Sequence, residues 1–122
     1  MFLIPSTVRV FLCNQPTDMR RSFDTLSGMV RDFLGGDPLS GHFYVFRSRR
    51  GDRVKVLYFD RSGFCLWYKR LEEGTFTFPK GEGRSIEVGA TELGLLLEGI
   101  DLAGATRQRR YQLPAATGRM SV

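Results

Sequence analysis

The sequence predicts a single α+β domain in which one long and one short helix pack on an antiparallel sheet. Three strand-like runs follow one another between residues 42 and 69, and residues 18–34 show helical periodicity. The 122 residues suit one domain, and a sheet built on a three-stranded meander leaves a face for helices to cover. We therefore expect the domain to occupy residues 1–102 and residues 103–122 to form a basic, flexible tail.

The predicted strands and the long helix begin near the N-terminus. Residues 7–12 read as a strand that Pro16 follows, and Thr17 or Asp18 can cap a helix over residues 18–34. Apolar side chains recur on one stripe of that helix, which we expect to be buried: Met19, Phe23, Leu26, Val30, Phe33 and Leu34. Gly35-Gly36 supplies a left-handed C-cap, and Asp37-Pro38 prevents continuation of the helix.

The central part of the chain predicts the meander. Residues 42–46, 54–59 and 64–69 are rich in the β-branched and aromatic residues that suit a pleated, half-buried surface. Residues 47–53 join the first two strands. Arg61-Ser62-Gly63 joins the second to the third, and we expect Gly63 to take the positive φ of that turn.

Shorter elements are predicted toward the C-terminus. Thr75 to Phe78 alternate like a short strand that stops at Pro79, and residues 85–88 read as another strand. Thr91 is expected to cap a short helix over residues 92–98, whose apolar side is Leu93, Leu96 and Leu97. From Ala103 onward small residues, polar residues and arginines dominate, which predicts little fixed structure.

The two cysteines and the length of the apolar runs indicate where the protein resides. Cys13 and Cys65 both lie in apolar runs, and a disulfide framework would need more cysteines in a secreted chain. No apolar run is long enough to span a membrane, and residues 1–5 lack the basic start of a signal peptide. We expect buried free thiols, a cytoplasmic location and no membrane contact.

Charge is distributed unevenly along this chain of net charge +5. Residues 47–70 contain eight basic and two acidic side chains, whereas residues 71–102 contain two basic and seven acidic ones. A concentrated basic segment attracts polyanions such as nucleic acid, and an acidic segment suits a basic protein partner.

The loop from Arg47 to Arg53 is the sharpest local feature, because Asp52 is the only acid among four arginines. Guanidinium groups on a protruding hairpin suit phosphate contacts or insertion into a minor groove. An ordinary solvated hairpin tip explains the loop equally well. The side chains that this reading assigns to DNA are Arg47, Arg49, Arg50, Arg53, Lys55, Lys69 and Arg70.

Aromatic side chains on the predicted strands offer a second way to contact nucleic acid. Bases can stack on exposed aromatic rings, as they do on sheets that bind single strands. Burial in the core is the more common use of such residues, and we expect it here for Tyr44, Tyr58, Trp67 and Tyr68.

Catalytic and metal-binding patterns are missing from the sequence. His42 is the only histidine and no cysteine stands at ligand spacing from it, which argues against a zinc site. The phosphate-binding pattern GxxxxGK[ST] is absent. Nothing in the sequence clusters the aspartates that could hold magnesium, which are Asp18, Asp24, Asp52, Asp60 and Asp101. We predict no catalytic residue, no metal and no cofactor.

Several segments together resemble the small accessory protein of IS66-type bacterial insertion sequences, commonly named TnpB. The similarity covers about residues 3–102 and is carried by TDMR at 17–20, FD at 23–24, DPLSGH at 37–42, VFR at 45–47, RRGDR at 49–53, Lys55, Asp60, GFCL at 63–66, YKRLE at 68–72 and LLEGID at 96–101. An unrelated RNA-guided nuclease shares the name TnpB, but none of its domains could fit in 122 residues.

The resemblance implies a protein encoded beside a much larger transposase and a second small protein, and needed for efficient transposition of a mobile element. The family has no assigned catalytic residues. We therefore expect a non-enzymatic accessory factor of DNA recombination whose partners are element-end DNA, the transposase and the second small protein. The alternatives are an adaptor that never touches DNA and a small metal-dependent nuclease that uses Asp52 or Asp60.

Overall fold

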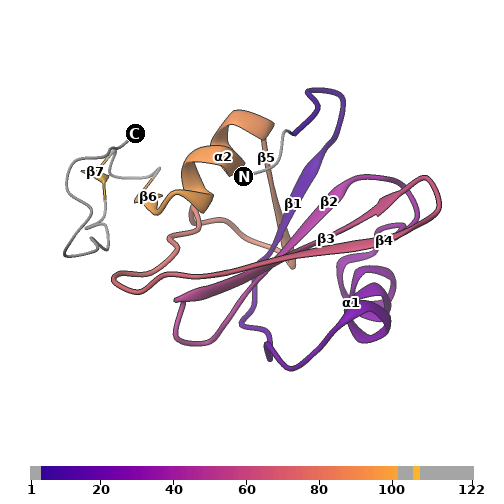
Figure 1. Ribbon diagram of the computed structural model, residues 1–122, viewed down its shortest axis with the longest axis horizontal. Helices are drawn as coiled ribbons and strands as arrows, with labels where there is room; N and C mark the ends of the chain where they lie inside the picture. The colour runs from indigo at the N-terminus through magenta and orange to yellow at the C-terminus, as the bar shows by residue number, and fades with distance from the viewer. Residues whose placement is uncertain (1–3, 102–105, 108–122) are drawn as a thin grey trace, which may run out of the picture.

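The computed structural model describes residues 4–101 and 106–107, which form a single small domain of the predicted α+β class (Figure 1). Its elements are β1 (Val10–Cys13), α1 (Phe23–Met29), the π-helical segment η1 (Val30–Leu34), β2 (Phe43–Arg47), β3 (Arg53–Asp60), β4 (Gly63–Arg70), β5 (Ser85–Val88), α2 (Ala90–Leu97), β6 (Ile100–Asp101) and β7 (Thr106–Arg107). None of the helices in this part of the chain has the length and apolar character needed to cross a bilayer.

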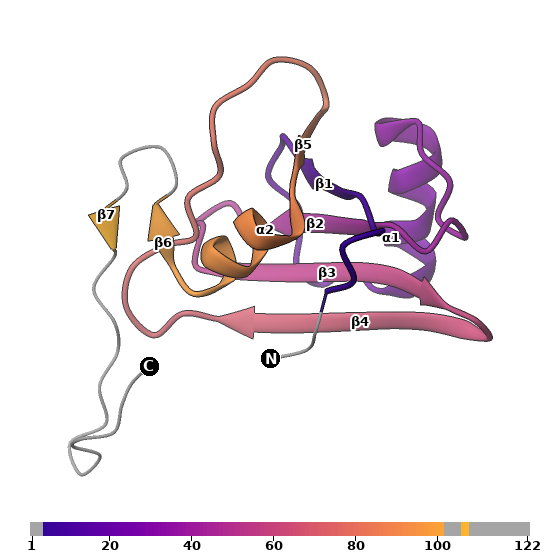
Figure 2. The same cartoon turned by 90° about the horizontal axis from the view of Figure 1, so that it is seen from above.

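The main sheet has five strands in the order β4-β3-β2-β1-β5 (Figure 2). Antiparallel pairs join β2 to β3, β3 to β4 and β1 to β5, but β1 and β2 run parallel, with Val10 beside Phe43. The expectation of a wholly antiparallel sheet is therefore wrong. The chain leaves β1, passes through α1 and re-enters the sheet beside β1, and such a helical crossover returns the next strand in the same direction.

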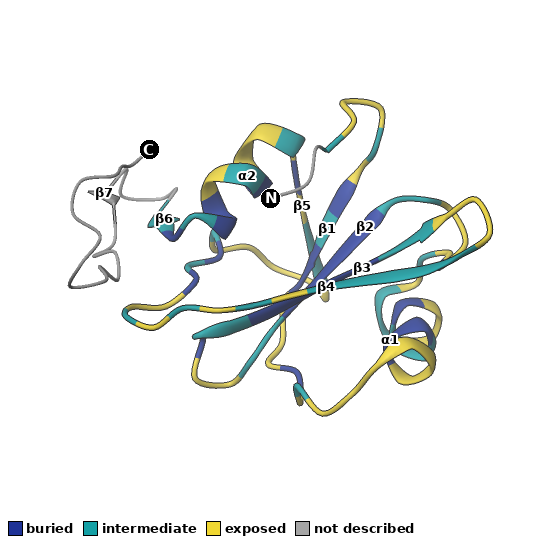
Figure 3. Cartoon of the chain, in the orientation of Figure 1, coloured by how far each residue is buried: buried dark blue, intermediate teal, exposed yellow. Residues whose placement is uncertain are grey.

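The sheet is covered on both faces, by α1 on one side and α2 on the other (Figure 1). Successive side chains of β3 alternate between the faces, so that Val54 and Val56 pack toward α2 whereas Leu57 packs toward α1. Figure 3 shows buried residues concentrated in the central strands β1, β2 and β3. We call the side of the sheet that α2 covers the α2 face and the side that α1 covers the α1 face.

The first helix differs from its prediction at the N-terminal end. It begins at Phe23 rather than at residue 18, because the Asp18 carboxylate accepts the backbone N–H of Arg20 at 2.9 Å and holds this stretch in a turn. Phe23 is 42 % exposed, so its predicted place on the buried stripe is wrong, whereas Leu26 and Val30 are fully buried. The predicted left-handed cap is confirmed at Gly35, with a φ of 70°.

Three local predictions fail in the remaining segments. Residues 75–78 form no strand; instead Phe76 and Phe78 are buried side chains of an extended segment whose Phe76 N–H donates to the carbonyl of Gly51. Their alternation reflects burial without a neighbouring strand. Gly89 rather than Thr91 caps α2, because the Glu92 carboxylate accepts the Gly89 N–H at 2.7 Å. In the β3–β4 turn, Arg61 rather than Gly63 takes a positive φ, of 54°.

Two further predictions concern the thiols and the tail. Cys13 and Cys65 are both free, as expected, but only Cys13 is buried, and burial raises the pKa of its thiol. The predicted tail at residues 103–122 lies outside the described residues except at β7, which pairs with β6. The flexibility and the boundary of the tail therefore stay predictions.

Candidate nucleic-acid interface

The β2–β3 hairpin presents Arg49 and Arg50 at an ordered tip. The Ser48 N–H donates to the carbonyl of Arg53 at 2.9 Å, and the Gly51 N–H donates back to Ser48 at the same distance. Both arginines are exposed, and neither makes a hydrogen bond or ion pair with any residue of the described chain. The sequence placed these two charges on a hairpin tip, and the structure leaves both of them open to a ligand.

Arg47, at the end of β2, is occupied inside the fold. Its Nη1 donates to the carbonyl of Phe76 at 2.8 Å, and its guanidinium carbon lies 4.3 Å from the ring centroid of Phe78. Burial of this half-exposed side chain lowers the pKa of Arg47. Through these two contacts, Arg47 holds residues 75–78 against the β2–β3 hairpin.

The two lysines of the predicted site also bond to backbone carbonyls. Lys55 is only 7 % exposed; its Nζ donates to the carbonyl of Arg21 at 2.6 Å and lies 4.8 Å from the ring centroid of Tyr68. Lys69 points to the opposite face, where its Nζ donates to the carbonyl of Leu97 at 2.9 Å. A cation there satisfies a helix C-terminal carbonyl and complements the dipole of α2.

The remaining predicted cations lie together on the α1 face. Arg53 and Arg70 stand directly opposite each other in the β3–β4 ladder, and Nη1 of Arg53 lies 3.4 Å from the hydroxyl of Tyr68. Arg70 is exposed and forms an ion pair with Glu72 at 3.0 Å. We call the surface formed by Arg49, Arg50, Arg53, Tyr68 and Arg70 the basic end of the sheet.

Two residues near this surface, Tyr68 and Arg21, lie where the sequence did not place them. Tyr68 was expected in the core but is 48 % exposed, because β4 is the outermost strand of the sheet. Arg21 was predicted to lie in the helix over residues 18–34, outside its apolar stripe. The contact of Lys55 with the Arg21 carbonyl brings Arg21 beside β3, and no sequence signal marks that approach.

The described residues contain no group of three histidine, cysteine, aspartate or glutamate side chains that could hold a metal ion. Asp52 and Asp60, the aspartates of the nuclease alternative, lie at opposite ends of β3, and Asp52 accepts the Ser48 hydroxyl at 3.3 Å. His42 accepts the backbone N–H of Arg9 through Nδ1 at 3.0 Å. These side chains do not converge on one site.

Comparison with known proteins identifies the family. The family described as IS66 Orf2 like protein matches residues 8–107. The chain belongs to this family. The proteins y4hO and y4jC of Sinorhizobium fredii, both described as uncharacterized, are 42 % and 36 % identical to it over 101 residues. These alignments cover 81 % and 83 % of the chain, and 88 % and 86 % of the two relatives.

No solved structure matches the chain. The resemblance seen in the sequence is confirmed, and membership of the IS66 Orf2-like family indicates a role in the transposition of an insertion sequence.

Proposed function

We propose that this IS66 Orf2-like protein is a non-enzymatic accessory factor of transposition that contacts element DNA through the basic end of its sheet. One observation carries the proposal: Arg49 and Arg50 stand exposed on an ordered tip with no acidic partner in the described chain. It acts beside the transposase and the second small protein of the element.

Phosphate contact is the chemistry that suits this surface. Each guanidinium that neutralises a phosphate releases condensed counterions, so binding weakens steeply as salt rises. The exposed ring of Tyr68 adds a surface on which an unpaired base can stack. Contacts of both kinds fix position along the nucleic acid rather than read base sequence.

The seven cations proposed for DNA divide into two groups in this arrangement. Three of them donate a side-chain hydrogen bond to a backbone carbonyl: Arg47, Lys55 and Lys69. We assign these three to stabilising the fold beneath the surface. Arg49 and Arg50 are assigned to direct contact, with Arg53 and Arg70 beside them.

A salt titration tests the assignment. The double variant Arg49→Gln/Arg50→Gln should bind element-end DNA more weakly and flatten the slope of log K against log salt by about two, since each phosphate contact contributes about 0.9. The matched control is Arg61→Gln, an exposed arginine at the opposite end of β3. Arg61→Gln should keep the wild-type slope.

Two results would overturn the proposal. One is a wild-type protein without DNA affinity even at low salt, and the other is a folded double variant with an unchanged slope. A protein adaptor without DNA contact would then be the favoured function, because the unpaired edge of β4 offers a binding site for another protein. Cleavage of element DNA in magnesium, abolished by Asp60→Ala, would instead support a nuclease.

A further inference from the structure

β4 is a long strand at the edge of the sheet. Eight residues form it, β3 pairs with one of its sides, and no strand of the described chain pairs with the other (Figure 2). The opposite edge is β5, which has only four residues. An unpaired edge of this length is a template for another strand.

The middle of β4 lacks the features that usually protect an edge. Residues 64–68 read Phe-Cys-Leu-Trp-Tyr, without a charge, a proline or a glycine. Of the two charged residues that follow, Lys69 turns to the carbonyl of Leu97 at the end of α2. An unprotected edge of this kind tends to pair with a strand of another chain, so we expect β4 to have a partner strand.

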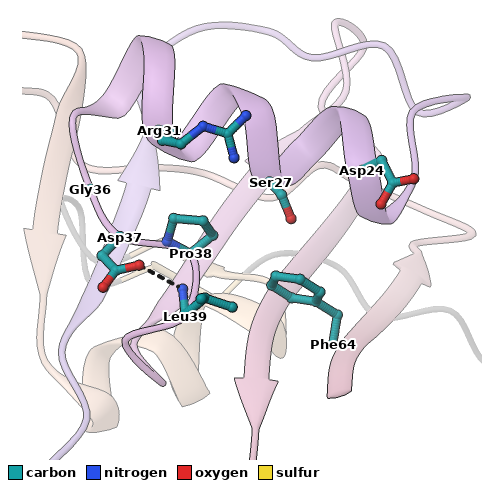
Figure 4. Close-up of a pocket in the computed structure, with 8 residues that line it drawn as sticks. All are labelled: Asp24, Ser27, Arg31, Gly36, Asp37, Pro38, Leu39 and Phe64. Atoms are coloured by element: carbon teal, nitrogen blue, oxygen red, sulfur yellow. Dashed lines mark hydrogen bonds between the residues drawn. The ribbon is translucent and has the colours of Figure 1, made fainter. Parts of the chain in front are cut away.

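A cavity of about 600 Å³ opens beside this edge on the α1 face (Figure 4). Its walls are Asp24 and Ser27 of α1, Arg31 of η1, the loop through Pro38 and Leu39, and Phe64 of β4. Figure 4 shows the Ser27 hydroxyl directed toward the space between Leu39 and Phe64.

Two side chains of the cavity lack the surroundings expected of them. Ser27 is 7 % exposed, and its Oγ has no hydrogen-bond partner in the described chain. Leu39 is 58 % exposed at the rim. A buried hydroxyl without a partner and an uncovered leucine both indicate that a further group completes this site.

Charge distinguishes the two ends of the α1 face along β4. The cavity end has more carboxylates than guanidinium groups: Asp24, Asp32, Asp37 and Asp60 against Arg31 and Arg61. The basic end has more guanidinium groups than carboxylates: Arg49, Arg50, Arg53 and Arg70 against Asp52, Glu72 and Glu73. A two-fold axis across an antiparallel pair joins unlike ends of such a surface.

We propose that two copies of this chain pair antiparallel through β4, each placing its Tyr68 and Arg70 at the cavity of the other. Side chains of β4 on the α1 face recur every second residue: Phe64, Leu66, Tyr68 and Arg70. An axis near the middle of the strand brings Tyr68 and Arg70 of the second copy beside Phe64 and the cavity.

Arginine and tyrosine match the lining of the cavity. The methylene stem of Arg70 and the ring of Tyr68 suit the apolar walls at Pro38, Leu39 and Phe64. The guanidinium donates to the Asp24 carboxylate, and the Ser27 hydroxyl gains a polar partner. Arg70 exchanges its exposed ion pair with Glu72 for this contact at little cost, because surface ion pairs contribute little.

The mass of the full chain in solution tests the pairing. Sedimentation equilibrium over increasing micromolar concentration should show a dimer of the 13.9 kDa chain. Leu39→Lys and Asp24→Arg should each weaken dimerisation about tenfold, because each sets a like charge against Arg70. Combining Asp24→Arg with Arg70→Asp should restore most of the affinity. The matched control is Leu95→Lys, which changes another exposed leucine, on α2, and should leave the dimer unchanged.

Hydrogen exchange locates the contact, since backbone amides of β4 should become protected as concentration rises. A monomer at every concentration would overturn the proposal and leave the edge to an extended segment of another protein. A dimer that is insensitive to Leu39→Lys and Asp24→Arg, with unprotected β4 amides, would overturn it equally. None of these measurements involves DNA, so their outcome is independent of the proposed DNA contact.

Discussion

At the scale of single residues, the structure separates cations that hold the fold from cations that remain open to a ligand. Lys55 illustrates the first group, because it is almost completely buried while its Nζ bonds to the Arg21 carbonyl and lies near the Tyr68 ring. Arg49 and Arg50 illustrate the second. Charge counts along the sequence treat all three alike.

Lys55→Met should therefore destabilise the protein. The substitution keeps an apolar stem of similar length but leaves the Arg21 carbonyl without its donor, at a cost of about 1–3 kcal/mol. Chemical denaturation measures the loss, and the exposed Lys80→Met serves as the control that should leave the free energy of unfolding nearly unchanged. A loss of DNA affinity in Lys55→Met without any loss of stability would contradict the structural role.

Asp18 provides a prediction about pH. Side-chain hydrogen bonds from Arg20, followed by the backbone N–H of Arg20, lower the pKa of Asp18 from 3.8 to about 2. Because the pKa is lower in the folded state, the ionised carboxylate stabilises the turn above pH 3.8, and this contribution disappears as the pH falls toward 2.

Titration followed by NMR should find the Asp18 carboxyl midpoint well below 3.8 in the wild type. Arg20→Gln should return it toward that value, because the replaced side chain provides the largest share of the shift. A midpoint that Arg20→Gln does not move would show that the turn is held by other contacts.

At the scale of elements, the first helix shows how one buried stripe is set by tertiary packing. Leu26 and Val30 enter the cluster between α1 and the sheet, whereas Phe23 stands in the first turn and remains partly exposed. The helix ends in the π-helical segment η1, which shifts the side chains that follow relative to a regular 3.6-residue period.

Two alanine substitutions in α1 should show that Leu26 contributes more to stability than Phe23, although periodicity places both on the buried stripe. Leu26→Ala should cost about 2–5 kcal/mol of unfolding free energy, because it opens a cavity in a fully buried site. Phe23→Ala should cost about 1 kcal/mol or less, since its ring already contacts solvent. Urea denaturation measures the unfolding free energy of both variants. Equal losses of unfolding free energy would contradict the observed burial of Leu26 and exposure of Phe23.

The hairpin between β2 and β3 depends on a segment that is distant in sequence. Gly51 accepts the Phe76 N–H at 2.7 Å, and Arg47 donates to the Phe76 carbonyl. These contacts hold residues 75–78 behind the tip that carries Arg49 and Arg50. The tip can therefore present its charges in a fixed direction.

At the scale of the whole molecule, the charges form a gradient along the outer strands, from the acidic cavity end to the basic end. In the proposed dimer, the antiparallel arrangement sets the two hairpin tips at opposite ends of one continuous sheet. Tyr68 and Arg70 then belong to the contact between copies, while Arg49 and Arg50 remain free to contact DNA. Two separated pairs of arginines could contact two stretches of phosphate backbone, so dimerisation and DNA contact are compatible.

The sequence by itself determined the local features of the protein. Alternation and composition placed β2, β3, β4 and β5, periodicity placed the later part of the first helix, and the glycine pair marked its end. The family and its role in transposition were likewise evident from sequence segments. All of these depend on residues close together in the chain, where backbone propensity and side-chain period act directly.

Only the tertiary structure decided which distant segments lie side by side. The parallel pairing of β1 with β2, the burial of Lys55 and the use of Arg47 to hold residues 75–78 depend on such approaches. The cavity beside Phe64 likewise combines a helix, a loop and an edge strand. A long cation carries the same sequence signal whether its nitrogen meets a carbonyl or water, and only the packed chain determines which of the two it meets.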